Sequence, residues 1–429
     1  MAAWRLFALI LWAATLGACA PLTIAWADLE PRGAEADPVL FTNDTPSSAE
    51  WEAETVPAYR RTLAETVYGV SPDARETTVA ERKVLDASAF GGKGVLTQYR
   101  LTAKLRFGSE TVDVRDSTGE GGFYMTLITP KNAQGPVPII LMETFCPRWN
   151  ALPHPAVARP ADTEDMGGPM FAVATYVFGR YICTPPIETV LDAGYALAAI
   201  HPGDVVPDDK DIAPAELARL AAGHNDPKTR WGAVAAWASV FSMGLDALAA
   251  DPAIDQEGLI LWGHSRYAKA ALLAAAHDER VDAVIAHQSG TGGAALNRNK
   301  KGESVKSITK NYPHWFANAY ADYAEREGEM PIDQHMLLAV VAPRPLFLGN
   351  ARRDVWSDPN GSFRAALGAN PAYQLYGRAG LTQNRLSSFI PGDAVAFWMR
   401  PGTHGVTEED WPAFLTFLDA HFSDRDAAS

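Results

Sequence analysis

The stretch Leu259-Ile260-Leu261-Trp262-Gly263-His264-Ser265-Arg266-Tyr267-Ala268-Lys269 passes from a short apolar run through Gly263 and Ser265 into a helix-forming segment. A serine on a tight turn between a strand and a helix is the arrangement of a nucleophile elbow. The amino end of the helix adds partial positive charge where an oxyanion would develop. The usual Gly-x-Ser-x-Gly pattern ends in glycine, whereas Tyr267 stands at that position here. The strand before Ser265 and the helix after it still favour this serine as a catalytic nucleophile.

The chain on both sides of this stretch alternates short apolar runs with helical segments. Runs without polar alternation suit strands buried on both faces, as in a parallel sheet covered by helices. These runs occupy residues 137–142, 196–201, 259–262, 283–286, 346–348 and 395–399, and helical patterns occupy 187–193, 231–250, 267–277, 334–341, 361–375 and 407–422. Before them, residues 96–107 and 122–130 alternate apolar with polar residues, which predicts antiparallel strands. We therefore expect a three-layer α/β/α sandwich of the α/β-hydrolase type with a mostly parallel central sheet.

The first residues predict export from the cytoplasm. Arg5 precedes an apolar run over residues 6–18 that is too short to stay in a membrane, so residues 1–27 are typical of a signal peptide. Two forms of it remain open. Leu16-Gly17-Ala18-Cys19 fits a lipoprotein signal with a lipid anchor at Cys19, and Ala25-Trp26-Ala27 fits ordinary signal peptidase. We expect a secreted or periplasmic protein, or an outer-membrane lipoprotein, without a membrane span.

The rest of the chain divides by composition. Residues 28–93 are polar, with one plausible helix near 49–67 and few strand signals, and we expect them to form an extension that wraps around the core. Residues 94–429 form the predicted catalytic domain, in which residues 146–186 fit neither helix nor strand and predict an insertion above the sheet. Cys146 and Cys183 form either one disulfide or two separate buried thiols. The distance between their Cα atoms in the fold decides which of the two is present.

Composition and charge exclude several classes of partner. The chain is 47% hydrophobic and 21% charged, which is enough apolar surface for a sizeable core. Its formal net charge of -14 repels phosphate backbones, so we expect no nucleic-acid partner. The sequence shows neither a convincing phosphate-binding glycine loop nor spaced metal ligands, and it therefore predicts no cofactor and no metal.

The base that would activate the serine follows the last apolar run. A serine hydroxyl becomes a good nucleophile when a neighbouring imidazole takes its proton. His404 lies in Pro401-Gly402-Thr403-His404-Gly405, between a buried strand and the final helix, where hydrolases of this type carry that imidazole. The other downstream histidines suit structural roles; they are His287, His314, His335 and His421. We therefore expect His404 to be the base.

The imidazole in turn needs a carboxylate that holds its tautomer and orientation. Asp354 follows the apolar run 346–348 and is our candidate. Asp358 is a rival, but Asp358-Pro359 fits the cap of the following helix. The alternative for Asp354 is an ion pair with Arg352 or Arg353.

At these residues the chain resembles the glucuronoyl esterases, carbohydrate esterases that cleave esters of glucuronic acid on xylan. The family's nucleophile motif is Gly-x-Ser-Arg-x-Gly-Lys, and Gly263, Ser265, Arg266 and Lys269 match it. The similarity extends from about Tyr124 to the carboxyl end. Serine followed by arginine, with lysine four residues after the serine, is uncommon among hydrolases in general.

The resemblance implies further site residues. Arg266 would add its guanidinium to the oxyanion hole, and Lys269, one helical turn along, would face sugar hydroxyls. Trp356 and Glu303 correspond to positions that contact the uronate. Gln288 falls where some members carry a catalytic glutamate, so here we expect it to contact substrate and Asp354 to be the acid.

The chain departs from the family at Ala268, which replaces the motif glycine, and in residues 146–186. The resemblance implies a serine esterase that hydrolyses 4-O-methyl-glucuronoyl esters in lignin-carbohydrate complexes through a Ser-His-Asp acyl-enzyme mechanism, with glucuronoxylan or a related uronate ester as substrate. Two alternatives remain: an esterase for another acyl or sugar ester, and a catalytically inactive carbohydrate-binding homologue.

Overall fold

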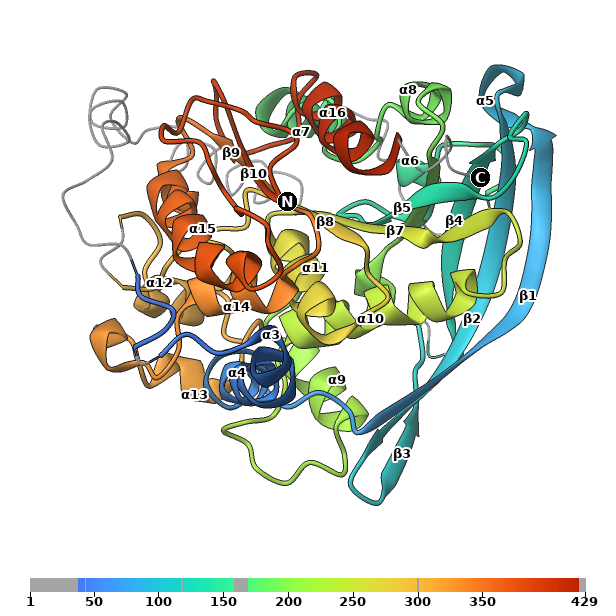
Figure 1. The fold of residues 1–429 in the computed structure, drawn as a ribbon. Coiled ribbons are helices and arrows are strands. Elements are labelled where there is room, and N and C mark those ends of the chain that lie inside the picture. Colours follow the sequence, from blue (N-terminus) through green and yellow to red (C-terminus); the bar gives the residue numbers. More distant parts are fainter. Residues whose placement is uncertain are drawn as a thin grey trace.

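A ten-stranded sheet forms the centre of the fold (Figure 1). The computed structural model describes residues 38–42, 44–116, 119, 121–157, 169–298 and 301–423. The predicted signal peptide, with Cys19, lies outside these residues. Within the described part of the chain, no helix is both long enough and apolar enough to cross a membrane.

The strands lie in the order β1-β2-β4-β6-β5-β7-β8-β9-β10, and β3 pairs with β2. Strands β6, β5, β7, β8, β9 and β10 are mutually parallel, whereas β1, β2 and β4 pair antiparallel. Both parts of the sheet agree with the sequence patterns. The bounds are β1 (Ala74–Ser88), β2 (Gly94–Phe107), β3 (Glu110–Asp113), β4 (Phe123–Pro130), β5 (Val137–Glu143), β6 (Ala196–Ile200), β7 (Ile254–His264), β8 (Ala283–His287), β9 (Leu346–Ala351) and β10 (Val395–Arg400).

Strand β1 corrects the expectation of few strands before residue 94. It is 15 residues long and pairs with β2 from Ala74 opposite Arg106 to Asp86 opposite Leu96. As an edge strand it is charged and mostly exposed, so it lacks the apolar pattern by which buried strands are recognised. Residues 74–88 therefore belong to the central sheet and do not form part of a separate wrap.

Helices cover both faces of the sheet, as Figure 1 shows. One face carries α10 (Ala233–Leu248), α11 (Arg266–His277), α14 (Gln334–Val341) and α15 (Pro359–Gln374), and the other carries α8 (Ile187–Asp192) and α16 (Asp410–Phe422). Along β9, Leu346 and Leu348 join the core on the first face and Phe347 joins the core on the second. The strand is thus buried on both sides, which explains its continuous apolar sequence. The expected three-layer architecture is confirmed.

Shorter helical elements complete the structure. The expected helix near 49–67 is present as a continuous helical segment of four elements. These are α3 (Ser48–Glu50), η1 (Trp51–Thr55), α4 (Val56–Leu63) and η2 (Ala64–Tyr68). The remaining elements are α5 (Ala89–Gly92), α6 (Arg148–Ala151), α7 (Pro169–Phe178), η3 (Pro202–Asp204), α9 (Ala213–Leu220), α12 (Val305–Asn311), α13 (Asn318–Ala321), η4 (Glu327–Glu329) and η5 (Val355–Ser357).

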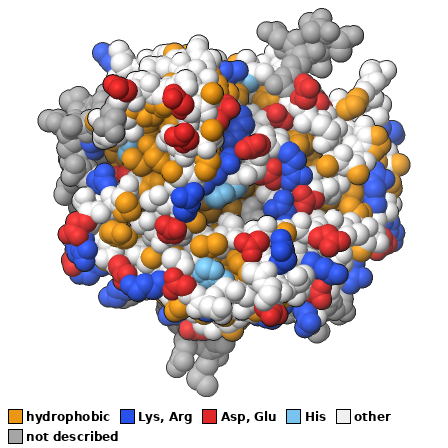
Figure 2. Space-filling model, turned by 60° about the horizontal axis from the view of Figure 1, so that its bottom comes forward, with side chains coloured by type: hydrophobic (Ala, Val, Ile, Leu, Met, Phe, Trp, Pro, Cys, Tyr) orange, Lys and Arg blue, Asp and Glu red, His pale blue; other side chains and the backbone are white. Residues whose placement is uncertain are grey.

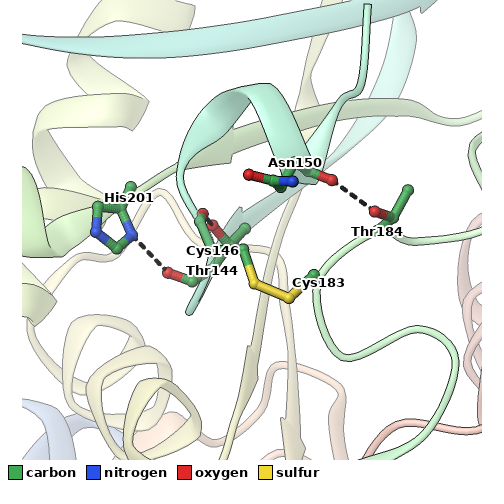
Figure 3. Close-up of a disulfide and its surroundings, with 6 residues drawn as sticks. All are labelled: Thr144, Cys146, Asn150, Cys183, Thr184 and His201. Atoms are coloured by element: carbon green, nitrogen blue, oxygen red, sulfur yellow. Dashed lines mark hydrogen bonds between the residues drawn. A yellow bond between two sulfur atoms is a disulfide. The ribbon is translucent and has the colours of Figure 1, made fainter. Parts of the chain in front are cut away.

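Cys146 and Cys183 form a disulfide, which decides between the two alternatives left open by the sequence (Figure 3). Their Cα atoms lie 5.4 Å apart. The bridge joins the segment after β5 to the segment before α8, so it closes the insertion at both ends. Thr184 strengthens the same junction by donating its hydroxyl to the carbonyl of Asn150.

Glu143, the last residue of β5, is a buried carboxyl group. Its side chain is fully buried, and neither carboxyl oxygen has a hydrogen-bond partner within the described residues. Burial raises the pKa of Glu143 well above the usual 4.5, which keeps the carboxyl neutral in the folded protein. The unfolded chain, by contrast, loses this proton near its ordinary pKa.

We expect removal of the disulfide to lower stability. The bridge spans a sequence separation of 37 residues. Closing such a loop in the unfolded chain is worth about 4 kcal/mol in the chain-entropy account. Paired Cys146→Ala and Cys183→Ala substitutions should lower the melting temperature by roughly 5 °C in a chain of this size, as followed by circular dichroism. An unchanged melting temperature, with wild-type protein treated with reductant as control, would contradict this expectation.

We expect Glu143→Gln to stabilise the protein at neutral and alkaline pH. Above pH 4.5 the unfolded state binds fewer protons at this group than the folded state, so wild-type stability falls as pH rises toward the folded pKa. The amide removes this loss, which amounts to about 1 kcal/mol for each pH unit. Melting temperatures at pH 4.5 and pH 8 should therefore diverge between variant and wild type only at pH 8. The exposed Glu110→Gln is the matched control.

Candidate active site

Ser265 stands on a strained turn between β7 and α11. Its backbone has φ 56° and ψ -120°, a left-handed conformation that side chains other than glycine rarely adopt. Its N–H donates to the carbonyl of His287 at 2.8 Å. A Cβ on Gly263 would lie 2.2 Å from the carbonyl oxygen of Tyr267, so only glycine allows the chain to turn this tightly. The expected nucleophile elbow is therefore formed, although Tyr267 and Ala268 replace the usual motif residues.

His404 and Asp354 are joined by a hydrogen bond. The distance from His404 Nδ1 to Asp354 Oδ2 is 2.7 Å. Burial alone would raise the pKa of Asp354, but the charge of His404 and hydrogen bonds from His404 and Ser357 lower it below its usual value. Asp354 thus remains a carboxylate that can orient the imidazole.

The rival carboxylate has another role. Asp358 accepts the N–H of Gly361 at 3.0 Å and so caps α15, as its sequence predicts.

The parallel sheet brings these groups to one edge. Ser265 follows β7, Asp354 follows β9 and His404 follows β10, and parallel strands present their carboxyl ends together. His264, next to the serine, places its ring centroid 4.7 Å from that of His404. His404, the predicted base, therefore lies beside the turn that carries Ser265.

Arg266 is held by an acidic residue and by aromatic rings. Its guanidinium forms an ion pair with Asp208 and lies 4.8 Å from the ring centroid of Trp315. The indole N–H of Trp315 also donates to Asp208, at 2.7 Å. His314 Nε2 lies 2.9 Å from the same carboxylate, which agrees with the structural role expected of it. Sequence reasoning missed Asp208, because nothing in its local sequence distinguishes it from other surface acids.

The four predicted substrate contacts lie at different depths. Trp356 is 53% exposed, whereas Glu303 and Lys269 are buried. Lys269 donates its ammonium group to the backbone carbonyls of Ser289 and Thr291, so it supports this turn from beneath the surface. Glu303 is tied to the Trp356 segment, because its N–H donates to the Trp356 carbonyl at 3.0 Å.

Gln288 lies elsewhere than the resemblance implies. It is 1% exposed, and its amide spans the backbone on both sides of His404. Its Oε1 accepts the N–H of Gly405 at 2.8 Å, and its Nε2 donates to the carbonyl of Thr403 at 3.3 Å. Both ends of the amide are used in this way, so Gln288 is buried and supports the backbone on either side of His404.

The predicted insertion also contacts the segment that carries His404. The N–H of Val406 donates to the carbonyl of Phe178 at 2.7 Å, and the N–H of Tyr181 donates to the carbonyl of Val406 at 3.0 Å. Phe178 ends α7, so the carboxyl-terminal half of the insertion lies against the catalytic edge. These hydrogen bonds hold the insertion against the segment that follows His404.

Comparisons with known proteins agree with this geometry. A sequence model described as glucuronyl esterase, fungi, matches residues 225–377, which include Ser265 and Asp354. A solved glucuronoyl esterase from Solibacter usitatus has 30% sequence identity and a TM-score of 0.73, over 91% of this chain and 99% of that one. The chain belongs to the glucuronoyl esterase family.

Other members of the family show how far the similarity reaches. A carbohydrate esterase of an unknown prokaryotic organism is 37% identical over 55% of this chain and 56% of its own length. A 4-O-methyl-glucuronoyl methylesterase of Hypocrea jecorina is 31% identical over 34% of each chain. A solved esterase of the same carbohydrate esterase family from a marine bacterial metagenome, described as promiscuous, has 27% identity and a TM-score of 0.72 over 91% of this chain and 98% of that one. The match thus spans about half or less of these two curated relatives, but nearly all of the solved bacterial structures.

The distribution of charged side chains on the surface bears on whether a phosphate backbone could bind there. On the face drawn in Figure 2, acidic and basic side chains are interspersed, and a histidine lies in the hollow near the middle. Within the described residues, no group of three or more histidine, cysteine, aspartate or glutamate side chains is placed to hold a metal ion. This mixed surface differs from the continuous basic surface that binds a phosphate backbone.

We expect Asp354→Asn to remove the activation of Ser265. An amide cannot hold the imidazole in the required tautomer, so labelling of Ser265 by a fluorophosphonate probe should slow by at least roughly 100-fold. Asp358→Asn is the matched control, because asparagine also caps helices and tolerates a left-handed backbone. Equal labelling of the two variants would remove Asp354 from the site.

Proposed function

We propose that the protein hydrolyses 4-O-methyl-glucuronoyl esters in lignin-carbohydrate complexes through a covalent acyl-enzyme on Ser265. The observation that carries the proposal is the 2.7 Å hydrogen bond between His404 and Asp354, next to a serine with φ 56°. The names of the relatives support the substrate class. A nucleophile, a base and an orienting acid at one edge of the sheet are the groups that ester hydrolysis needs.

Each group has one task in the reaction. Ser265 Oγ attacks the ester carbonyl while His404 Nε2 takes the hydroxyl proton, and Asp354 stabilises the imidazolium that forms. The tetrahedral oxyanion accepts hydrogen bonds from the backbone N–H and the guanidinium of Arg266. When the carbon–oxygen bond breaks, His404 returns the proton to the leaving alcohol. Water, activated by the same imidazole, then releases the uronic acid and frees the serine.

The surroundings of Arg266 favour its role at the oxyanion. Asp208 and Trp315 fix the guanidinium before substrate arrives, so little reorganisation is needed as negative charge develops. Its side chain keeps 25% of its surface exposed, although the guanidinium Nε is buried. Asp208 is thus a positioning residue in this proposal.

The sugar would lie against Trp356. An exposed indole offers a flat apolar face to a sugar ring and one N–H to a hydroxyl. Glu303, adjacent to Trp356, accepts hydrogen bonds from sugar hydroxyls in this arrangement. Lys269 supports the site from beneath through its hydrogen bonds to the carbonyls of Ser289 and Thr291. Glucuronoxylan, or a related polymer that carries esterified uronate, is the proposed substrate.

We further propose that the protein acts outside the cytoplasm. The disulfide between Cys146 and Cys183 supports this, because such bridges persist in oxidising compartments. The predicted signal peptide supports it as well, with the lipid anchor at Cys19 as the alternative to soluble export.

A second candidate is an esterase for other acyl or sugar esters. The insertion over residues 146–186 favours it, because this segment departs from the family pattern and contacts the His404 segment through Val406. One solved bacterial relative is itself described as promiscuous. The two candidates share the catalytic residues and differ in the group that the acyl pocket accepts.

We expect the purified protein to hydrolyse a benzyl ester of glucuronic acid with much higher kcat/KM than a simple aryl acetate. Ser265→Ala should abolish both activities, with a loss of roughly 10⁴-fold or more, because the nucleophile is absent. A preference for acetate would support the broader esterase. Wild-type rates in Ser265→Ala would overturn the mechanism. Absence of both activity and fluorophosphonate labelling in the wild type would favour the inactive carbohydrate-binding homologue.

A further inference from the structure

The loop that carries His404, residues 401–405, lies over a buried arginine. Arg400 ends β10 and is 2% exposed. Its guanidinium donates to three carbonyl groups of the loop: Pro401 at 2.8 Å, Thr403 at 3.1 Å and Gly405 at 2.6 Å. Of these carbonyls, that of Gly405 belongs to a buried residue, and a backbone avoids leaving such a group without a partner. One planar side chain thus sets the path of the whole loop.

Asp410 ties the two ends of this loop together. It is fully buried in the first turn of α16, and both of its carboxyl oxygens lie 2.9 Å from Arg400 Nε. It also accepts the N–H of Thr407 at 2.7 Å. Arg400 precedes the loop and Thr407 follows it, so this carboxylate closes the loop at its base.

The neighbouring strand β8 and the residue that follows it, Gln288, support the loop. As described above, Gln288 accepts from Gly405 and donates to Thr403, the residues on either side of His404. His287, also on β8, places its Nε2 3.2 Å from Asp410 Oδ1, and His264 Nδ1 lies 3.0 Å from His287 Nδ1. Burial lowers the pKa of both histidines, so both rings are neutral around the ion pair.

The support lies on one side of the loop only. Arg400, Asp410 and Gln288 are each at most 2% exposed, whereas the His404 side chain is 32% exposed and directed to Asp354. The imidazole contacts Asp354 at 2.7 Å and Ser357 Oγ at 3.5 Å, both through Nδ1, and its backbone is fixed from the buried side.

We propose that Arg400, Asp410 and Gln288 are positioning residues that hold the 401–405 backbone and thereby set His404 in register with Ser265. This inference rests on the proposed role of His404 as the base. A shift of the loop by about 1 Å would move the imidazole out of reach of the serine proton, and errors of that size cost roughly 100-fold in rate. Arg400 and Asp410 touch neither substrate nor reacting atoms.

The test compares two arginines in equivalent settings. Arg344 is partly buried and donates to backbone carbonyls, those of Ala275, Asp278 and Val281, at the far end of α11. Arg400→Lys and Arg344→Lys both keep the charge and lose the planar fork. We expect Arg400→Lys to lower kcat and the rate of fluorophosphonate labelling together by roughly 10- to 100-fold, with KM within about threefold of wild type. Arg344→Lys should leave both rates near wild type, while it lowers the melting temperature by about as much as Arg400→Lys does.

Hydrogen exchange provides a readout that does not depend on activity. In Arg400→Lys and in Gln288→Met, amides of residues 401–407 should exchange faster than in wild type, whereas Arg344→Lys should not change them. Unchanged exchange in this segment, or an Arg400→Lys protein that labels at the wild-type rate, would overturn the inference. If wild type itself is not labelled, the proposed function fails, and the exchange result alone decides whether these residues hold the loop.

Discussion

The active site depends on the parallel arrangement of β7, β8, β9 and β10. Each of these strands ends at the same edge of the sheet, so the residues that follow them meet although they are far apart in the sequence. Ser265 and Asp354 follow two of the strands and His404 a third. Helices bury both faces of the sheet and keep the strand ends fixed. The catalytic geometry is thus a consequence of packing over the whole core.

Three acidic side chains at or near the candidate site each contact a basic side chain. Asp354 faces His404, Asp208 faces Arg266, and Asp410 faces Arg400. A buried ion pair contributes little net stability, but it fixes geometry, and removal of one partner leaves a charge without compensation. Glu143 is buried without a charged partner among the described residues. Burial raises its pKa and so favours the neutral carboxyl group.

The insertion is part of the catalytic edge and not a separate appendage. The disulfide fixes its two ends, and Phe178 and Tyr181 pair with Val406 directly after the His404 loop. The predicted insertion is thus fixed by the disulfide at its two ends and by backbone hydrogen bonds to the segment that follows the His404 loop.

The sequence by itself determined the fold class, because strands buried on two faces and amphipathic helices leave periodic patterns. It also singled out Ser265, His404 and Asp354 as candidates, since each lies shortly after a recognisable buried strand, and the structure brings them to one edge of the sheet. It did not reveal β1, whose exposed edge carries no apolar pattern. Nor did it reveal Asp208 or the support of the His404 loop by Arg400, Asp410 and Gln288. Those contacts join residues more than a hundred positions apart or depend on a loop's exact path, so only the tertiary structure decided them. The disulfide belongs to the same group, because two cysteines pair only when the fold brings their Cα atoms within reach.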